Sequence, residues 1–330
     1  MKAMVFTQYG SVEKLQIKEV EKPTPNDNEV LIKVKAASIN EWDMGLLKGK
    51  PFVNRLMLGI LRPKKFNIMG SDIAGTIEAA GKNTSQFKVG DEVFGDLSVC
   101  HWSGFAEYVT ATEKALTLKP ANMTFEQAAA IPQAGLLAWQ GLCQGGIQES
   151  EHQKQYSPKK VLINGASGGT GSFAIQIAKA FGAEVTGVCR TSKMEFVLDL
   201  GADYVLDYTK EDFTQNGKTY DIIIDVMAYH PALDYRRSLS PTGHYVMLGG
   251  KSALVNKMLL LGIWTSMTSQ KKMGLLLLRA NKQLDEIITL FEQAKVTPVI
   301  DQCFPLSQGV EAFSYYAQGY AKGKIVITME

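Results

Sequence analysis

The first third of the chain alternates apolar and polar residues in short stretches. Residues 30–36 (VLIKVKA) and 73–79 (IAGTIEA) show this alternation, which is typical of half-buried β-strands. Turn residues precede two further stretches of this kind, at residues 93–94 and 105–109. Short strands separated by Gly, Pro and Asn predict a barrel-like β-domain over residues 1–129.

A helical pattern follows at residues 125–144. Thr124 precedes it, and Gln127 stands at the position that completes a capping box at a helix N-terminus. We therefore expect a helix over these residues that begins after Thr124.

From residue 161 onward, short apolar strands alternate with helical stretches. The expected strands are residues 161–163, 185–189, 204–206, 222–224 and 245–248, and the expected helices between them include residues 173–181 and 193–200. This alternation predicts an α/β fold with a doubly wound parallel sheet and helices on both faces. Near the end we expect an amphipathic helix at 284–295 and strands at 299–300 and 325–328, while the polar segment 148–158 reads as an exposed loop.

A glycine-rich turn, Gly165–Gly171 (GASGGTG), joins the first of these strands to the first helix. It fits the G-x-G-x-x-G pattern of dinucleotide-binding folds, with Ala166 in place of the first glycine. Such a turn brings side-chain-free backbone and the N–H groups of a helix N-terminus to a pyrophosphate. The alternative is a tight strand–helix turn without a chemical role. The candidate cofactor-binding residues in the turn are Ser167, Gly168, Gly169, Thr170 and Gly171.

The residues after the second strand indicate which dinucleotide binds. An NAD-binding site of this type places Asp or Glu there to bond the ribose 2′-hydroxyl. This chain has Arg190, Thr191, Ser192 and Lys193 instead, which supply positive charge and hydroxyl groups for a 2′-phosphate. We therefore predict NADP(H) as the cofactor, with Tyr208 covering the adenosine phosphate. The alternative is a solvated basic turn.

The composition is that of a globular protein. The chain has 330 residues, of which 45% are hydrophobic and 21% charged, so intrinsic disorder is excluded as its main state. Its 4 cysteines lie far apart in the sequence, which excludes a compact cysteine zinc site and argues against a disulfide framework. No apolar run approaches the ~20 residues that span a bilayer, and no targeting pattern is visible. We therefore expect a cytoplasmic protein with a small-molecule substrate and no nucleic-acid partner.

Charge is unevenly distributed, although 35 Lys and Arg nearly balance 33 Asp and Glu for a formal net charge of +2. Residues 44–71 and 251–284 contain no acidic residue, and both hold several basic residues set among apolar ones. These two segments predict either solvated, partly buried loops or a surface for anions or an anionic membrane. A peripheral contact with a membrane surface is therefore one hypothesis for this chain.

Several ordered motifs together resemble one known family over essentially the whole chain. They are Asn40-x-x-Asp43, Gly70–Gly75 (GSDIAG), Gly90–Gly95 (GDEVFG), Phe105–Tyr108 (FAEY), Ala134–Gln140 (AGLLAWQ), the glycine turn and Gly323–Val326 (GKIV). With these motifs the chain resembles the zinc-independent quinone oxidoreductases, the zeta-crystallin-like branch of the medium-chain dehydrogenase/reductases.

The resemblance implies a nested fold. A GroES-like catalytic domain is expected from residues 1–129 together with 281–330, and a Rossmann NADP-binding domain over residues 130–280 is inserted between them. In this family the active site lies in the cleft between the two domains. The resemblance also implies a homodimer.

The same comparison bears on metals. Zinc-dependent relatives have a cysteine ligand where this chain has Asn40, and Gly-His-Glu where it has Gly70–Asp72. A catalytic zinc ion takes its protein ligands from Cys, His, Asp and Glu, and the first two positions are lost here. We therefore expect no metal, and hydrogen-bond polarisation of a substrate carbonyl takes the place of a Lewis acid.

The resemblance also implies roles for individual residues. Asn40 is expected near the nicotinamide, where its amide would donate to the substrate oxygen; a loop-bracing role is the alternative. Asp43 is a second catalytic candidate, although bracing of the same loop is the favoured interpretation. Lys324 is implied to contact the pyrophosphate. The backbone implied to hold the nicotinamide carboxamide belongs to Leu248, Gly249 and Gly250.

Together these features predict an enzyme that reduces quinones or α,β-unsaturated carbonyl compounds with NADPH and without zinc. Reduction of the double bond of 2-alkenals or enoyl compounds is the alternative enzyme function, and the sequence does not separate the two. A hypothesis from another class is an NADPH-binding sensor or membrane-surface partner with little turnover, which the two basic segments motivate.

Overall fold

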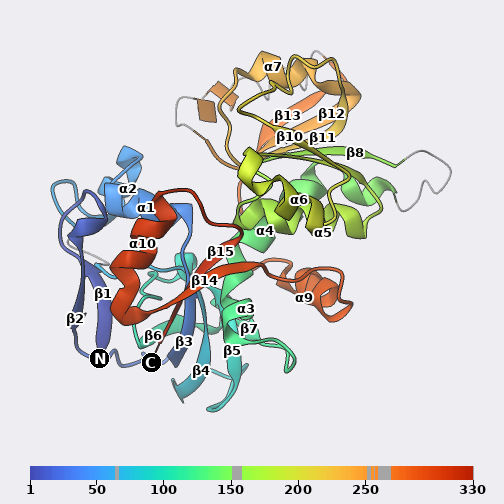
Figure 1. Ribbon diagram of the computed structural model, residues 1–330. Helices are drawn as coiled ribbons and strands as arrows, with labels where there is room; N and C mark the ends of the chain where they lie inside the picture. Colours follow the sequence, from blue (N-terminus) through green and yellow to red (C-terminus); the bar gives the residue numbers. More distant parts are fainter. Residues whose placement is uncertain (64–66, 151–157, 251–253, 256, 259–268, 330) are drawn as a thin grey trace. The chain divides into compact units, whose positions relative to one another are not determined.

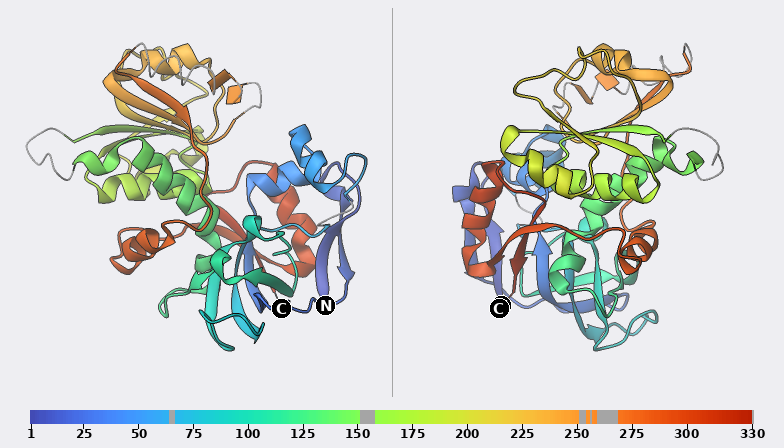
Figure 2. Two further views of the ribbon diagram at one scale, coloured as in Figure 1. Left: turned by 180° about the vertical axis from the view of Figure 1, so that it is seen from behind. Right: turned by 45° about the vertical axis from the view of Figure 1, so that its right-hand side comes forward.

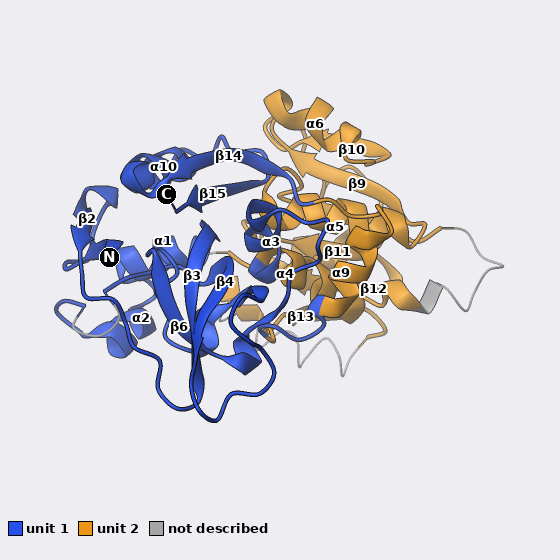
Figure 3. Ribbon diagram, turned by 90° about the horizontal axis from the view of Figure 1, so that it is seen from below, with its two compact units in different colours: residues 1–133, 280–284, 298–330 blue, residues 134–279, 285–297 orange. Residues whose placement is uncertain are grey.

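The structure of the protein is a computed structural model that describes residues 1–63, 67–150, 158–250, 254–255, 257–258 and 269–329 (Figure 1; Figure 2). These residues form two compact units, shown in different colours in Figure 3. Unit 1 comprises residues 1–133, 280–284 and 298–330, and unit 2 comprises residues 134–279 and 285–297. Along the chain, unit 2 is thus inserted into unit 1, and both chain ends belong to unit 1.

Unit 1 is built on a seven-stranded sheet and a separate two-stranded sheet. The large sheet has the order β14-β15-β3-β4-β5-β7, with β6 paired to β3, and the small sheet pairs β1 with β2. Most neighbours are antiparallel, and β14 runs parallel to β15. The strands are β1 (Lys2–Phe6), β2 (Leu15–Glu19), β3 (Glu29–Ser38), β4 (Asp72–Ala80), β5 (Glu92–Asp96), β6 (Tyr108–Thr112), β7 (Thr117–Leu118), β14 (Ile300–Pro305) and β15 (Lys324–Thr328).

The apolar positions of these strands fill one core. Ile32 of β3 is fully buried, and the ring of Phe105 packs edge-on against that of Phe313 with 5.4 Å between centroids. The helices of this unit are α1 (Glu41–Lys48), α2 (Phe52–Leu58), α3 (Phe125–Ala130) and α10 (Gly309–Ala317). The β-rich domain predicted for the first part of the chain is thereby confirmed.

Unit 2 contains a six-stranded, all-parallel sheet in the order β10-β9-β8-β11-β12-β13. This is the strand order of a doubly wound dinucleotide-binding fold, in which the order reverses next to the first strand. The predicted Rossmann sheet is confirmed. The strands are β8 (Lys160–Asn164), β9 (Glu184–Cys189), β10 (Tyr204–Asp207), β11 (Tyr220–Asp225), β12 (Leu239–Met247) and β13 (Lys272–Leu275).

Helices cover both faces of this sheet. Helix α5 (Gly169–Ala180) joins β8 to β9 on one face, and α7 (Ala232–Arg237) joins β11 to β12 on the other (Figure 1; Figure 2). Opposite faces are expected because the crossovers proceed in opposite directions from the centre with the same hand. Further helices in the described part of the chain are α4 (Pro132–Gln144), α6 (Met194–Asp199) and α9 (Leu284–Glu292). Among the described residues, no helix is long and apolar enough to cross a membrane.

Three details differ from the sequence prediction. The expected helix 125–144 is two helices, because Pro132 has no N–H to continue the hydrogen-bond ladder of α3. The strand expected at 105–109 begins only at Tyr108, since residues 105–107 pair with β1 instead. Residues 285–297, assigned to the first domain, group with unit 2, where the Gln176 amide exchanges hydrogen bonds of 2.8 and 3.0 Å with the Thr297 backbone.

Other local predictions agree with the structure. The capping box is present, with Thr124 and Gln127 side chains each accepting from the other residue's N–H. Of the loop expected at 148–158, residues 151–157 lie outside the described part of the chain.

Candidate functional site

The glycine turn of unit 2 contains two glycines that the protein itself requires. Gly165 follows the buried strand β8 with φ of +86°, a backbone conformation that favours glycine. Gly171 lies in the first turn of α5, where a Cβ atom would sit 2.2 Å from the Gly165 carbonyl oxygen. Both positions are therefore dictated by the close packing of strand, turn and helix.

Gly168 is a different case. It precedes α5 with φ of −86°, and a Cβ atom there would meet nothing nearer than the Gly165 oxygen at 3.7 Å. Nothing inside the protein thus demands a glycine at this position. Gly168, the N-cap of α5, has no side chain to cap the helix, so in the described part of the chain the first N–H groups of α5 have no capping side chain at that position. The turn fits a dinucleotide pyrophosphate, which needs both the missing side chain and the helix N-terminus.

The residues after β9 meet the end of β10. Arg190, Thr191 and Ser192 are exposed, whereas Lys193 is buried and precedes helix α6. The Arg190 Nε donates to the Tyr208 hydroxyl at 2.5 Å, so the structure brings together the two ends of the predicted 2′-phosphate site. The prediction that these residues bind the adenosine phosphate stays a prediction.

A carboxylate that the sequence reasoning missed lies beside them. Asp207, the last residue of β10, is opposite Cys189 in the sheet and accepts hydrogen bonds from the Thr191 and Thr209 hydroxyls. These bonds, the one from Thr191 first, lower the pKa of Asp207 to about 2. The Thr191 hydroxyl proton is therefore already engaged. The parallel pairing of β9 with β10 could have predicted this contact, because it brings the ends of both strands to one edge of the sheet.

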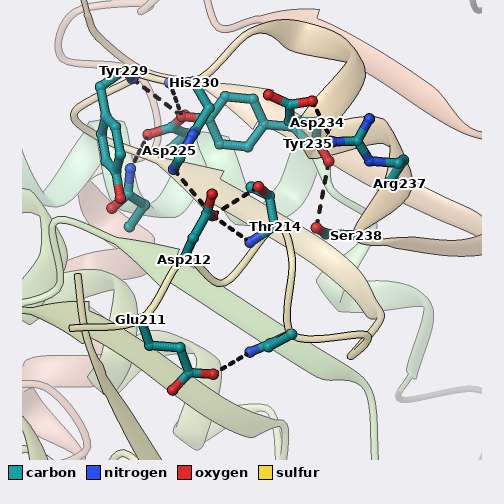
Figure 4. A network of polar contacts seen from close by, with 12 residues as sticks. Glu211, Asp212, Thr214, Asp225, Tyr229, His230, Asp234, Tyr235, Arg237 and Ser238 are labelled. Atoms are coloured by element: carbon teal, nitrogen blue, oxygen red, sulfur yellow. Dashed lines mark hydrogen bonds and ion pairs between the residues drawn. The ribbon is translucent and has the colours of Figure 1, made fainter. Parts of the chain in front are cut away.

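A second buried carboxylate ties the ends of three strands together. Asp225, at the end of β11, accepts from the Asn164 amide and from the Tyr245 hydroxyl, each at 2.8 Å. Burial raises the pKa of Asp225, and bonds from Tyr235, Tyr245 and Asn164 oppose that shift. The Tyr235 hydroxyl in turn accepts from the backbone N–H groups of residues 229–230 (Figure 4). This network holds the loop after β11 in place next to the glycine turn.

The predicted carboxamide-binding segment adjoins the same network. The Leu248 N–H donates to the Asp225 carbonyl oxygen at 2.8 Å, and the Gly249 carbonyl accepts from the Ala228 N–H at 3.2 Å. Gly250 has φ of +148°, and a Cβ atom there would lie 2.8 Å from that of Ala228. The segment is thus held against the loop after β11, and its role toward a nicotinamide stays a prediction.

Asp43 in unit 1 makes the contacts of a brace. Its fully buried carboxyl accepts from the Asn40 N–H at 2.8 Å and from the Gly70 N–H at 3.1 Å. These bonds join the start of α1 to the residues before β4. Burial raises the pKa of Asp43 to about 7 despite the two backbone donors. The bracing interpretation accounts for both carboxyl oxygens.

The Asn40 side chain meets Lys324 in the interior of unit 1. The Lys324 Nζ donates to Asn40 Oδ1 at 2.5 Å and to the Ile39 carbonyl oxygen at 3.1 Å. On its other side, Asn40 Nδ2 donates to Ser71 Oγ at 3.4 Å. Burial lowers the pKa of Lys324, and nearby carboxyls, that of Asp72 first, oppose the shift. The structure therefore places Lys324 with the catalytic candidate; the predicted pyrophosphate contact stays a prediction.

Two further carboxyls face this lysine, and neither was a candidate site residue. Asp72 Oδ2 lies 4.0 Å from the Lys324 Nζ and accepts from the Gln133 N–H at 3.0 Å. Burial raises the pKa of Asp72 to about 7, and the Lys324 charge acts against that rise. Asp96 is paired with Asp72 across β4 and β5, and burial raises its pKa as well. Strand pairing alone brings these two acids together.

The residues at this cluster do not fit a zinc ion. The positions where zinc-dependent relatives place ligands hold the Asn40 amide and the Ser71 hydroxyl, which are poor zinc donors. The one carboxylate among the three positions, Asp72, lies beside an ammonium group, which would repel a metal cation. Within the described ranges, no three His, Cys, Asp or Glu side chains are arranged to hold a metal ion.

Part of the first basic segment forms an exposed apolar surface in unit 1. Phe52 is 61% exposed and Leu61 is 91% exposed, with basic residues between and around them. Much of the second segment, 251–284, lies outside the described residues. The exposed apolar side chains of the first segment are Phe52, Val53, Leu56, Met57, Ile60 and Leu61.

Comparison with known proteins agrees with this architecture. Residues 26–121 match the alcohol dehydrogenase GroES-like domain family, and residues 200–327 match the zinc-binding dehydrogenase family. A chloroplastic quinone-oxidoreductase homolog of Spinacia oleracea is 33% identical, over 99% of this chain and 98% of its own. The 2-methylene-furan-3-one reductase of Solanum lycopersicum is 34% identical, over 99% of this chain and 79% of its own.

A solved structure gives the same result. The quinone oxidoreductase from Coxiella burnetii superposes with a TM-score of 0.88 at 28% identity, covering 100% of this chain and 99% of its own. Full-length relatives of this kind imply an oxidoreductase that uses a nicotinamide cofactor. The chain belongs to the medium-chain dehydrogenase/reductase family, in its quinone oxidoreductase branch.

Proposed function

We propose that the protein reduces quinones or α,β-unsaturated carbonyl compounds with NADPH, without zinc. The observation that carries this proposal is the side-chain set around Asn40. It offers an amide donor where zinc-dependent relatives have a cysteine ligand, and a buried ammonium lies beside that amide. The quinone oxidoreductase and the furanone reductase among the relatives support the substrate class.

The proposed reaction requires few reactive groups from the protein itself. When bound, NADPH supplies the hydride, and the reduced product takes up one proton for each hydride. The Asn40 Nδ2 group is the donor that would polarise the acceptor carbonyl. The hydrogen bond from Asn40 Nδ2 to Ser71 Oγ is long and weak at 3.4 Å, and the Asn40 side chain also donates to the Asp72 carboxyl, so a substrate oxygen would take the place of the weak Ser71 partner.

The proposed cofactor preference rests on the end of β9. Arg190 and Ser192 are exposed there, and the Tyr208 ring, 40% exposed, is held by the Arg190 bond. A guanidinium, a hydroxyl group and an aromatic ring suit an adenosine 2′-phosphate. Asp207 opposes that preference, because the Thr191 and Thr209 hydroxyls keep it ionised; the Lys210 Nζ, 3.7 Å from its Oδ2, offsets part of that charge.

The test is a screen of the purified protein for NADPH oxidation against a 1,4-naphthoquinone, a 2-alkenal and an enoyl thioester. We expect turnover with at least one acceptor, a loss of about 10- to 100-fold in kcat for Asn40→Ala, and no stoichiometric zinc by metal analysis. Stoichiometric zinc that activity requires would contradict the zinc-free mechanism. Background rates with every acceptor would favour an NADPH-binding protein with little turnover.

Product analysis in the same screen separates the two enzyme functions. Reduction of a 2-alkenal or an enoyl thioester to its saturated product would identify a double-bond reductase. In the absence of oxygen, hydroquinone formed in equal amount to the NADPH consumed, with no semiquinone radical as first product, would identify two-electron quinone reduction, whereas a semiquinone radical as first product would indicate one-electron transfer.

Contact with an anionic membrane surface is a second proposal, carried by the exposed apolar side chains of residues 52–61. They are set among basic residues, and no acid occurs from 44 to 71, so the surface is complementary to anionic headgroups. We expect co-flotation with vesicles that contain phosphatidylglycerol but not with pure phosphatidylcholine. The double variant L56S/L61S should lose it, whereas L233S, a matched change at an exposed leucine in unit 2, should not. Equal binding to both vesicles would remove the proposal.

A further inference from the structure

Lys324 carries an ammonium group in the interior of unit 1. Its side chain is 4% exposed, and its Nζ donates to Asn40 Oδ1 and to the Ile39 carbonyl oxygen. Burying a charged amine is costly unless strong acceptors surround it. A neutral side chain at this position would avoid the free-energy cost of burying a charge, so the presence of a lysine here indicates a role for its charge.

Strand pairing brings the lysine to this place. Asn40 lies two residues beyond the end of β3, and Lys324 is the first residue of β15, which runs antiparallel to β3 with Val326 opposite Ser38. The two side chains thus meet at one end of the paired strands, although 284 positions separate them in the sequence. Their contact is set by the backbone of the large sheet and does not depend on a mobile loop.

The ammonium decides how the Asn40 amide is oriented. Lysine has donors only, so the group that faces its Nζ must be the amide oxygen. The Nδ2 group must then point the other way, toward Ser71 Oγ. A neutral partner that could both donate and accept would leave the two amide orientations close in energy. The charge therefore selects one of them.

The ammonium also interacts with a group of buried acids. Asp43, Asp72 and Asp96 are all fully buried, and the Lys324 charge acts on the pKa of each of them. Its own pKa is lowered by burial and supported by the same three carboxyls. Removing the charge would leave these acids without their buried cation, so the lysine is not an interchangeable surface residue.

We propose that Lys324 is a positioning residue for Asn40. Its ammonium lies among the side chains that stand at the zinc-ligand positions of zinc-dependent relatives, and it turns the Asn40 Nδ2 group toward the substrate carbonyl. This inference rests on the proposed function, because it assigns Asn40 the donor role in that reaction. It assigns Lys324 a partner other than the cofactor pyrophosphate.

A double-mutant cycle on kcat tests the proposal. We expect Lys324→Met to lower kcat by about 10-fold or more while the NADPH Kd, from tryptophan fluorescence, changes less than about twofold. The double variant N40A/K324M should be no slower than Asn40→Ala alone, because the lysine acts through the amide. Lys322→Met, an exposed lysine next to the same strand, is the matched control and should leave both quantities unchanged.

A second readout does not depend on turnover. Selective ¹⁵N-asparagine labelling gives the side-chain NH₂ signals of Asn40, which Asn40→Asp identifies by their loss. We expect two separated signals protected from hydrogen exchange in the wild type, and faster exchange with altered shifts in Lys324→Met. If Lys324→Met does not fold, K324M/D72N removes one charge of each sign and serves for the same measurement.

Three results would overturn the inference. An NADPH Kd raised tenfold or more in Lys324→Met with unchanged kcat would assign the lysine to the cofactor. Multiplicative losses of kcat in the double variant would show that it does not act through Asn40. Unaltered Asn40 signals would show that it does not orient the amide. A wild type without turnover contradicts the proposed function, and the labelled spectra still test the lysine.

Discussion

The two candidate regions use the same kinds of groups in opposite ways. In unit 1, the Asn40 cluster combines an amide, a hydroxyl, carboxyls and a lysine, all buried and bonded to one another. In unit 2, the paired ends of β9 and β10 combine a carboxylate, hydroxyls and an arginine, but Arg190 and Ser192 are exposed. The polar groups of the first region are bonded mainly to one another, whereas Arg190 and Ser192 of the second region are exposed to solvent.

The carboxyl groups show this difference most clearly. Burial raises the pKa of Asp72 to about 7, although a lysine lies nearby. Hydrogen bonds from Thr191 and Thr209 lower the pKa of Asp207 to about 2. Burial is the largest cause of the shift at Asp72, whereas hydrogen bonds are larger causes than burial at Asp207. A similar set of residues can therefore give an acid that holds its proton near neutrality or one that is always ionised.

The largest expected effect comes from the glycine turn. It contains Gly171, which close packing inside the protein requires, and Gly168, where a Cβ atom would have room. Gly171→Ala should destabilise the protein by about 3 kcal/mol or more, because the added Cβ would lie 2.2 Å from the Gly165 oxygen. Gly168→Ala should change stability by less than about 1 kcal/mol, because its Cβ has room. Urea denaturation measures both.

The same pair of variants tests the cofactor cradle. Gly168→Ala should fold normally and yet raise the NADPH Kd by about tenfold or more, since its Cβ would fill the space left for the pyrophosphate. A folded Gly168→Ala protein that binds NADPH like the wild type would contradict the assignment of this turn. Near-equal stability of the two variants would contradict the packing argument.

The sequence predicted the glycine turn of unit 2, but it did not predict the contacts that Lys324 and Asp207 make. The glycine turn, its strand and its helix are contiguous in the chain, so local pattern predicted them. Lys324 and Asn40 are far apart in the sequence, and only the antiparallel pairing of β15 with β3 brings them together. Similarly, Asp207 meets Thr191 because β10 lies parallel to β9. Local residue patterns do not contain such pairings, and a family motif identifies Lys324 without its partner.

A pH effect on stability distinguishes the buried acids of unit 1. The pKa of Asp43 is about 7 in the folded protein against an ordinary value of 3.8. Between these values the folded chain holds a proton that the unfolded chain has released, so stability falls as pH rises and levels off above about 7. For this one carboxyl the slope is at most about 1.4 kcal/mol per pH unit.

Denaturation of the wild type and of Asp43→Asn between pH 4 and 8 measures this contribution. The variant cannot titrate at this position, so its stability should depend less on pH over the interval between the two pKa values of Asp43. Identical pH profiles for the two proteins would show that Asp43 titrates normally. That result would remove the contrast between the buried acids of unit 1 and Asp207.

Arg190→Ala tests whether the exposed region selects the cofactor. We expect the NADPH Kd to rise about 10- to 100-fold and the NADH Kd to change less than about threefold, because only NADPH has the 2′-phosphate. Lys218→Ala, which removes a charge elsewhere on unit 2, is the control. Equal losses for the two cofactors would assign Arg190 to a part of the dinucleotide that both share.

The smallest expected effect is on the NADPH Kd of an Asp207 variant. This Kd should fall, whereas that of Arg190→Ala should rise. Asp207→Asn removes a negative charge beside the proposed 2′-phosphate site, while its amide oxygen still accepts from Thr191 or Thr209. The NADPH Kd should therefore fall by about two- to fivefold, with little change for NADH, and the difference should shrink at high salt because screening weakens long-range repulsion. Tighter binding of both cofactors to the same extent would mean that Asp207 acts on the shape of the turn and not through its charge. Weaker binding of NADPH would show that the ionised carboxylate is needed to hold Thr191 in place, so that this acid, like those around Asn40, serves the protein's own structure.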